Sequence, residues 1–407
     1  MAETVDYNLA VTGYIMSKIF PYYIKGNKNL ITIMDGTKYE LEDLNYLNFY
    51  KQNDDNYLNA IENIKIKLQE YFMSTNLSIF IGSGCSCSSI PLMGNTFKRI
   101  KNELEDKHLL GEYLDENNNN IEKCLDWLIS GLQFLKEDDD KFPSYQALYY
   151  TILSKLKDSI ISLDPTKSDL TLRDYCNFFN YVFSIRKENH FYPLNIFTTN
   201  YDLFIEKALE NVKIHFINGF NGIINREFDP SMFRIRYVDD ENRYKDKWDP
   251  ISRFCRLFKL HGSINWFIEN DRVIEKIGYD VSADQSNTVI YPTVNKHMQS
   301  LQSPFSELFR EFSLQLQKPN MTLIVMGYGF PDEHINQLMQ QALSNETFSL
   351  IVMGDIREEG LREFYKKNCN KQNLHVIGGD TLDGQMIHYF SYLVENIFEL
   401  EKVDINV

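Results

Sequence analysis

Residues 77–86 read LSIFIGSGCS, an apolar run followed at once by Gly82-Ser83-Gly84. A short apolar run without alternation is typical of a strand that is covered on both faces of a sheet. Glycines directly after such a strand allow the backbone to turn tightly and to approach a bound phosphate. A full dinucleotide fingerprint would need a third glycine where Cys87 stands, so the motif alone leaves open both an ordinary tight turn and a phosphate site.

Five further apolar runs resemble the first one. They are residues 194–198 (LNIFT), 256–260 (RLFKL), 322–326 (TLIVM), 348–352 (FSLIV) and 373–377 (NLHVI). Helical spacing of apolar residues precedes the first run and follows the fourth, the residues being Ile61, Ile64, Leu68 and Phe72, then Ile335, Leu338, Met339 and Leu343. Strands that alternate with helices predict an α/β fold with a parallel sheet of about six strands.

The rest of the chain is predicted to form an extension and two insertions. Residues 1–60 are an N-terminal extension, with an apolar segment at 14–24 and a hairpin at 30–41 that turns at Asp35-Gly36. Residues 61–400 form the α/β domain, with a helical insertion at about 97–190 and an irregular one at about 214–252. We expect the extension and the helical insertion to carry oligomer or partner contacts.

Composition excludes several classes of protein. The 407 residues carry a net charge of -15 and no basic run, which disfavours nucleic-acid binding by this chain alone. The six cysteines include no C-x-x-C pair, so we expect neither a zinc ribbon nor another metal site. No apolar stretch approaches the roughly 20 residues of a membrane span. We therefore expect a soluble, cytoplasmic protein with free thiols.

Polar or glycine-rich motifs follow all five of the other strands, the last two being GD (354–355) and GGD (378–380). Parallel strands bring their carboxyl ends to one edge of a sheet, so we expect these motifs to lie close together. In TTNYD (198–202), Asn200 and Asp202 either orient a water or a ribose hydroxyl, or cap a helix. In HGS (261–263), His261 is either a general base or a structural histidine.

The third motif, GYGFPDE (327–333), offers Gly327 for close ligand approach, and Tyr328 and Phe330 either for stacking or for core packing. Asp332 and Glu333 are expected to favour a helix N-terminus. Cys85 and Cys87 are expected to be packing residues.

Together the four motifs match a known family. GSGCS (82–86), TTNYD (198–202), LHGS (260–263) and GYGFPDEHI (327–335), in this order, resemble the sirtuin-like family of bacterial antiphage proteins over residues 77–355. Chain length and the N-terminal extension are most similar to the sirtuin-like subunits that work with a HerA-type ATPase. The resemblance implies a Rossmann-like fold that binds NAD.

The resemblance also implies roles for individual residues. Asn200 would hold the attacking water beside the nicotinamide ribose, Asp202 would bind the nicotinamide or ribose side, and His261 would be the catalytic histidine. The cofactor-binding residues would be Gly82, Ser83, Gly84 and Ser86 at the phosphates, Thr199 and Tyr201 beside Asn200, and Gly327, Tyr328 and Phe330 near the adenosine half.

The expected function is hydrolysis of NAD to nicotinamide and ADP-ribose, in phage defence by NAD depletion, gated by assembly with a HerA-type ATPase and as a homo-oligomer. One alternative is an NAD-dependent protein deacylase, although the zinc-ribbon cysteines of deacylating sirtuins are missing. A dehydrogenase would want an acidic residue where Lys98, Arg99 and Lys101 stand. The last alternative is a noncatalytic NAD-binding scaffold.

Overall fold

A computed structural model describes residues 21–26, 30–32, 38–40, 54–104, 121–186, 193–244, 247–270, 272–276, 288–290 and 303–399. The predicted turn at Asp35-Gly36 lies outside these residues. Strands β2 (Leu30–Thr32) and β3 (Lys38–Glu40) pair antiparallel, as predicted for the two arms of the hairpin.

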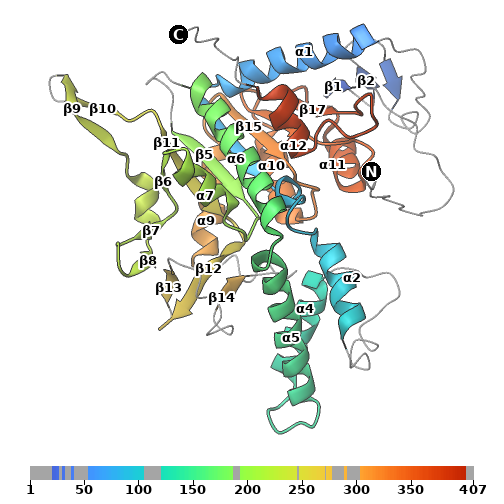
Figure 1. The fold of residues 1–407 in the computed structure, drawn as a ribbon, viewed down its shortest axis with the longest axis vertical. Coiled ribbons are helices and arrows are strands. Elements are labelled where there is room, and N and C mark those ends of the chain that lie inside the picture. The colour runs from blue at the N-terminus through green and yellow to red at the C-terminus, as the bar shows by residue number, and fades with distance from the viewer. Residues whose placement is uncertain are drawn as a thin grey trace.

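The core of the molecule is an eight-stranded sheet with the order β1-β17-β16-β15-β4-β5-β11-β6 (Figure 1). The strands are β1 (Tyr22–Lys25), β17 (Leu374–Gly378), β16 (Ser349–Met353), β15 (Met321–Met326), β4 (Asn76–Ile81), β5 (Leu194–Thr198), β11 (Phe254–Lys259) and β6 (His215–Ile217). The six predicted strands are adjacent to one another and parallel. Two strands were not predicted, namely β6, which extends the parallel sheet, and β1, which pairs antiparallel with β17.

The order of the strands makes the sheet doubly wound. From β4 the chain adds β5 and β11 on one side, and it then crosses over to add β15, β16 and β17 on the other. This is the strand order of a Rossmann fold, so the fold prediction is confirmed. The direction of winding reverses between β4 and β15, and ligands of such sheets bind outside the carboxyl ends at that point.

Helices cover both faces of the sheet (Figure 1). One face packs on α9 (Phe305–Leu316), α10 (Glu333–Ala342) and α11 (Glu359–Asn368). The opposite face packs on α1 (Asp54–Phe72), α6 (Pro165–Ile185), α7 (Phe204–Asn211) and the C-terminal turns α12 (Phe390–Tyr392) and η5 (Leu393–Ile397). Neighbouring strand residues such as Phe80 and Ile81 enter different cores, since successive side chains of a strand point to opposite faces.

Three further helices form a separate helical lobe. They are α2 (Met93–Glu103), α4 (Ile121–Phe134) and α5 (Phe142–Ile161), and they enclose an apolar core of their own around Cys124, Leu125 and Ile152. In Figure 1 this helical lobe extends away from the sheet, beyond the carboxyl ends of its strands. The connecting residues 137–140 are exposed. The predicted insertion at 97–190 thus contains most of the lobe together with α6, which belongs to the cover of the sheet.

The insertion at about 214–252, for which the sequence predicts no regular structure, contains several short strands. After β6 come β7 (Phe220–Asn221), β8 (Arg226–Phe228) and the 3-10 turn η3 (Pro230–Arg234). Strands β7 and β8 join β12 (Gly262–Glu269), β13 (Arg272–Glu275) and β14 (Thr288–Ile290) in a five-stranded sheet. Strands β9 (Val238–Tyr244) and β10 (Lys247–Pro250) form a hairpin that projects from the body (Figure 1). No helix in the described ranges is long and apolar enough to cross a membrane.

Candidate active site

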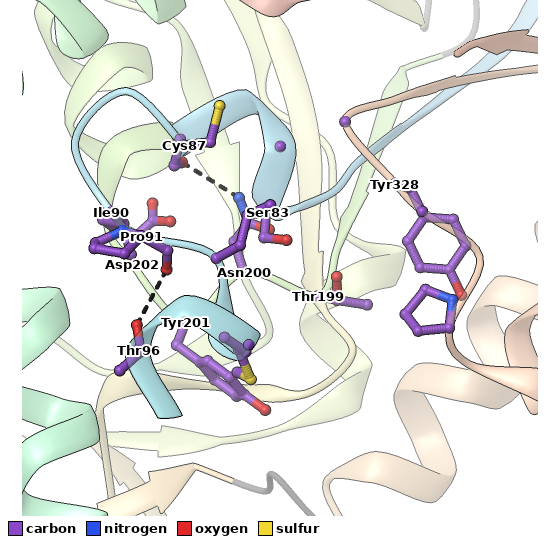
Figure 2. A pocket seen from close by; sticks show the side chains of 18 of the residues that line it. Ser83, Cys87, Ile90, Pro91, Thr96, Thr199, Asn200, Tyr201, Asp202 and Tyr328 are labelled. Carbon is purple, nitrogen blue, oxygen red and sulfur yellow. Dashed lines mark hydrogen bonds between the residues drawn. The ribbon is translucent and has the colours of Figure 1, made fainter. Parts of the chain in front are cut away.

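A pocket of about 750 Å³ opens at the carboxyl ends of the central strands, at the point where the winding reverses. Its floor is formed by the loops after β4, β5, β11 and β15, and its outer wall by the helical lobe through residues that include Leu92, Met93, Ile121, Leu156 and Ile160. Figure 2 shows Asn200 close to Ser83, with Asp202 on one side of this pair and Tyr328 on the other. The volume falls in the range of about 300–1,000 Å³ that is usual for small-molecule sites.

Three glycines let two of these loops touch backbone to backbone. The Gly82 N–H donates to Met326 O at 2.8 Å, and the Gly84 N–H donates to Gly327 O at 2.8 Å. A Cβ on Gly82 would lie 2.3 Å from Gly327 O, and a Cβ on Gly327 would lie 2.5 Å from the Cys85 N. Gly327 also has a φ of +63°, which disfavours other residues. The glycines are therefore required for the crossing of the loops, and a short 3-10 turn, η2 (Ser83–Ser86), follows them.

Asn200 follows β5 and is 4% exposed. Its side-chain Nδ2 donates to Gly82 O at 3.2 Å and to Ser86 Oγ at 3.4 Å. A carbonyl oxygen can only accept, so the nitrogen must face Gly82 and the amide oxygen must point elsewhere. This Oδ1 is buried and has no hydrogen-bond partner among the described residues. A buried acceptor in this condition is unusual in a folded protein and indicates a place for a ligand or a water.

Ser86 accepts a hydrogen bond from the side-chain amide of Asn200 and helps to hold it in place. The Ser86 side chain is 1% exposed, and its hydroxyl lies 3.0 Å from the phenol oxygen of Tyr175 on α6. Tyr175 is fully buried between Phe204 and Phe390. The position of Asn200 is therefore fixed by a buried chain of hydroxyl groups that reaches the helical cover of the sheet.

Asp202 and Glu206 surround the buried ammonium of Lys259, the last residue of β11. Lys259 Nζ donates to the main-chain oxygen of Asp202 at 2.5 Å and to Glu206 Oε1 at 2.8 Å. The Asp202 side chain accepts from the Phe204 N–H at 3.0 Å, at the start of α7. Burial raises the pKa of Asp202, and the charge of Lys259 opposes that rise. Burial likewise raises the pKa of Glu206.

His261 follows β11 and lines the same pocket as Asn200. The imidazole is largely buried, and its Nε2 lies 3.0 Å from Asp332 Oδ2. The other carboxylate oxygen of Asp332 accepts from the N–H groups of His334 and Ile335 at the start of α10. The sequence predicts this capping role of Asp332, but not its contact with His261.

Ten of the twelve site residues that the sequence singles out line one pocket, and two do not. The ten are Ser83, Gly84, Ser86, Thr199, Asn200, Tyr201, Asp202, His261, Gly327 and Tyr328. Gly82 lies behind the lining, at the loop crossing. Phe330 is buried against Tyr328 and Phe364 in the core of the sheet, which corresponds to the packing alternative.

Sequence reasoning missed the pocket residues that follow β16 and β17. Glu358, His388 and Tyr389 line the pocket from these two loops. Arg357 holds the loops together by donating to both carboxylates of Asp355 and Asp380. The signal was visible, because β16 and β17 end in GD and GGD just as the other strands end in polar motifs.

The cysteines near the site differ from each other. Cys85 is buried, as predicted, but Cys87 is exposed and lines the pocket, so the prediction that it packs was wrong. Burial raises the pKa of the Cys85 thiol. In the part of the chain that the structure describes, no group of three or more His, Cys, Asp or Glu side chains is arranged to hold a metal ion.

The chain was compared with models of known protein families, and one of them matches the segment that carries much of the pocket floor. Residues 194–377 match the family model of the SIR2-like domain. The match supports a sirtuin-like family. The matched segment begins at β5 and ends in β17, so it includes Asn200, His261 and the loop at Gly327. SIR2-like domains are generally NAD-dependent enzymes, which implies the use of NAD here. A search of curated proteins finds no match to the chain.

Proposed function

We propose that this protein hydrolyses NAD at the bond between nicotinamide and ribose. The observation that carries the proposal is that Asn200 and His261, from the ends of the neighbouring strands β5 and β11, line one pocket, and both lie in the segment that matches the SIR2-like domain. A neutral amide and an imidazole are the groups needed to orient a water molecule and to accept its proton.

Three features of the pocket suit NAD. Its glycine-lined floor is at the switch point of the sheet, where dinucleotides bind in Rossmann folds. Gly329 leaves open space, because a Cβ there would meet nothing within 4 Å. The buried Oδ1 of Asn200 has no described partner and is available to a ribose hydroxyl or to water. Asp202 adds negative charge beneath the site when it is ionised, which would stabilise a cationic sugar.

The chemistry balances without a further reactant. The nicotinamide–ribose bond breaks with its electron pair going to the ring nitrogen, which leaves an oxocarbenium-like sugar as in glycoside hydrolysis. Water held by Asn200 adds its oxygen to the anomeric carbon. His261 accepts the proton that this water loses. The products are nicotinamide, ADP-ribose and one proton.

The test is nicotinamide release from NAD by the purified full chain, with and without a co-encoded HerA-type ATPase, followed by chromatography. We expect Asn200→Ala and His261→Ala each to lower the rate by about 10²-fold or more, since positioned acid–base groups contribute about 10²–10⁴. His215→Ala, which changes an exposed histidine on β6, is the matched control and should keep the wild-type rate. Wild-type rates in both site variants would refute the assignment.

Two other functions remain alternatives that the same experiment separates. A protein deacylase would release nicotinamide only when an acyl-lysine peptide is added. A noncatalytic scaffold would bind NAD, measured by calorimetry, and would release no nicotinamide with or without the ATPase. We place hydrolysis first because both polar groups that it needs line the pocket.

We further propose that the activity serves phage defence and is gated by assembly, as a homo-oligomer, with a HerA-type ATPase. Unrestrained NAD hydrolysis would deplete the cell's own NAD, so such an enzyme needs a control. The expected result is a rate of nicotinamide release that rises when the ATPase is added. A rate that is independent of the ATPase at all ratios would contradict the gating and leave the hydrolase assignment in place.

A further inference from the structure

The carboxylate of Asp332 performs two tasks at once. Its Oδ1 accepts from the His334 N–H at 3.0 Å and from the Ile335 N–H at 3.3 Å, which caps α10. Its Oδ2 lies 3.0 Å from His261 Nε2. Asp332 is 5% exposed, so both contacts are made away from bulk water, where interactions between charged groups are stronger.

The loop before α10 is built to hold this carboxylate in place. The phenol oxygen of Tyr328 accepts from the Asp332 N–H at 3.3 Å, and the Asn336 amide donates to Phe330 O at 2.9 Å. Phe330 has a φ of +58°, a conformation that costs energy for a residue with a side chain. Its ring packs on Phe364 at 4.7 Å, and this packing helps to hold the loop in that shape.

We infer that Asp332 is a positioning residue, which fixes the orientation and the tautomer of the His261 ring for its role as base. The expected effect on reaction rate rests on the proposed hydrolysis of NAD. The contact between Asp332 and His261 does not depend on that proposal. An ionised carboxylate can only accept, so the neutral imidazole keeps its proton on Nε2 and its lone pair on Nδ1. The negative charge also stabilises the imidazolium that forms when the ring accepts a proton.

The double role makes Asp332→Asn an informative change. An asparagine has one side-chain oxygen, and the two N–H groups at the start of α10 need it. The amide nitrogen is then left facing His261, where it can only donate. Nε2 would have to accept, and the ring proton would move to Nδ1. The variant thus keeps the cap and the shape of the side chain, but it inverts the tautomer of the base.

Other titratable groups that line the pocket could also affect the protonation of His261. Those that line it are Cys87, Tyr201, Asp202, Tyr328, Glu358, His388 and Tyr389. The Tyr201 ring lies 6.4 Å from the imidazole, centroid to centroid. Asp202 has its own partners in the Phe204 N–H and the nearby Lys259, whereas Asp332 lies at hydrogen-bonding distance from the imidazole.

The first measurement is nitrogen-15 NMR of histidine-labelled full-length protein, with the His261 signal assigned from His261→Asn. The chemical shifts of the two ring nitrogens report the tautomer, and their titration reports the pKa. We expect Asp332→Asn to lower the pKa of His261 by about 1 or more and to move the proton to Nδ1. Glu333→Gln removes the adjacent negative charge at the same helix start and should leave both properties of His261 unchanged.

The second measurement is the pH dependence of NAD cleavage. Protonation of His261 stops the base, so the rate falls at low pH. Loss of the carboxylate makes the imidazolium less stable, and the acid limb should move to lower pH. We expect kcat to fall by about 10²-fold in Asp332→Asn with little change in KM. Asp332→Ser keeps a capping oxygen at the start of α10 and removes the charge. It should therefore shift the acid limb of the pH–rate profile in the same direction without destabilising the helix.

The outcomes separate the two proposals. A His261 signal with the wild-type pKa and tautomer in both Asp332 variants would overturn the positioning role, whatever the rate of NAD cleavage. A second outcome is that the Asp332 variants alter the titration of His261 but the wild type does not cleave NAD. This result would overturn the proposed function and leave the positioning role of Asp332 in place. A merely structural Asp332 would change thermal stability without moving the acid limb.

Discussion

Asp202 is a buried acid whose ionised form the fold does not favour. Burial raises its pKa above the value of about 3.9 that it has in an unfolded chain, and Lys259 offsets this only in part. A raised pKa means that the side chain contributes most to stability below the unfolded pKa, and that this contribution is lost as the pH rises through the folded pKa. At neutral pH the carboxylate is therefore kept at a cost in stability, as is common for groups that serve a site.

We expect Asp202→Asn to unfold at a temperature equal to or above that of the wild type at pH 7 and to lose NAD cleavage. Each unit by which the pKa is raised corresponds to about 1.4 kcal/mol, or roughly 2 °C in Tm for a chain of this length. Thermal unfolding from pH 4 to 8 measures this, and the variant should lose less stability with rising pH. Asp229→Asn is the contrasting control, because hydrogen bonds from Ser231 lower the pKa of Asp229. A variant that is less stable than the wild type at pH 7 would contradict the account of Asp202.

At the scale of the element, α1 and α6 are joined by one buried guanidinium. Arg186 follows α6, and its Nη1 donates to Phe72 O at 2.7 Å and to Ser74 O at 2.6 Å, at the end of α1. The last carbonyls of a helix have no partner within it, so they need such a donor when they are buried. Burial of the guanidinium lowers the pKa of Arg186 to about 10.

We expect Arg186→Met to reduce the free energy of unfolding by about 2–4 kcal/mol, because each buried carbonyl left without a partner costs about 1–3 kcal/mol. Urea denaturation followed by circular dichroism measures the change. Arg173→Met, on the exposed face of α6, is the matched control and should change stability by less than about 1 kcal/mol. Equal stabilities for the two variants would show that the contacts of Arg186 add nothing.

At the scale of the whole molecule, the pocket joins two bodies with separate cores. The pocket floor is formed by loops of the eight-stranded sheet. Its wall includes Met93 of α2 and Leu156 and Ile160 of α5, which belong to the helical lobe. Figure 1 shows the helical lobe extending beyond the strand ends, joined to the sheet through η2 and α6. A ligand that fills the pocket must therefore contact both bodies, and it should reduce local opening in each of them.

We expect NAD bound to His261→Ala, which should bind without rapid turnover, to slow amide hydrogen exchange in both bodies. Protected peptides should cover the floor loops at 82–87, 199–202 and 327–332, and also the α5 residues near 156–160. The β9–β10 hairpin, which projects from the body, serves as the internal control and should exchange at an unchanged rate. Protection that is confined to the floor loops would contradict a pocket wall formed by the helical lobe.

The sequence by itself determined the six parallel strands and the edge at which their motifs gather. Runs such as LSIFI and TLIVM are apolar on both faces, which only a doubly covered parallel strand requires, and the polar residues after them must then share one edge. The end strands β1 and β6 were missed, because short strands at the edge of a sheet carry no such continuous apolar run.

Tertiary structure alone decided what the motif residues contact. Gly82 and Gly327 are 245 positions apart, and their mutual packing depends on the switch between β4 and β15. Asp332 carries a local capping signal that the sequence displays, whereas its contact with His261 joins residues 71 positions apart. A local feature such as a helix cap depends on neighbouring residues, so the sequence can predict it. A contact between residues on different strands forms only when folding brings the strand ends together, so the tertiary structure decides it.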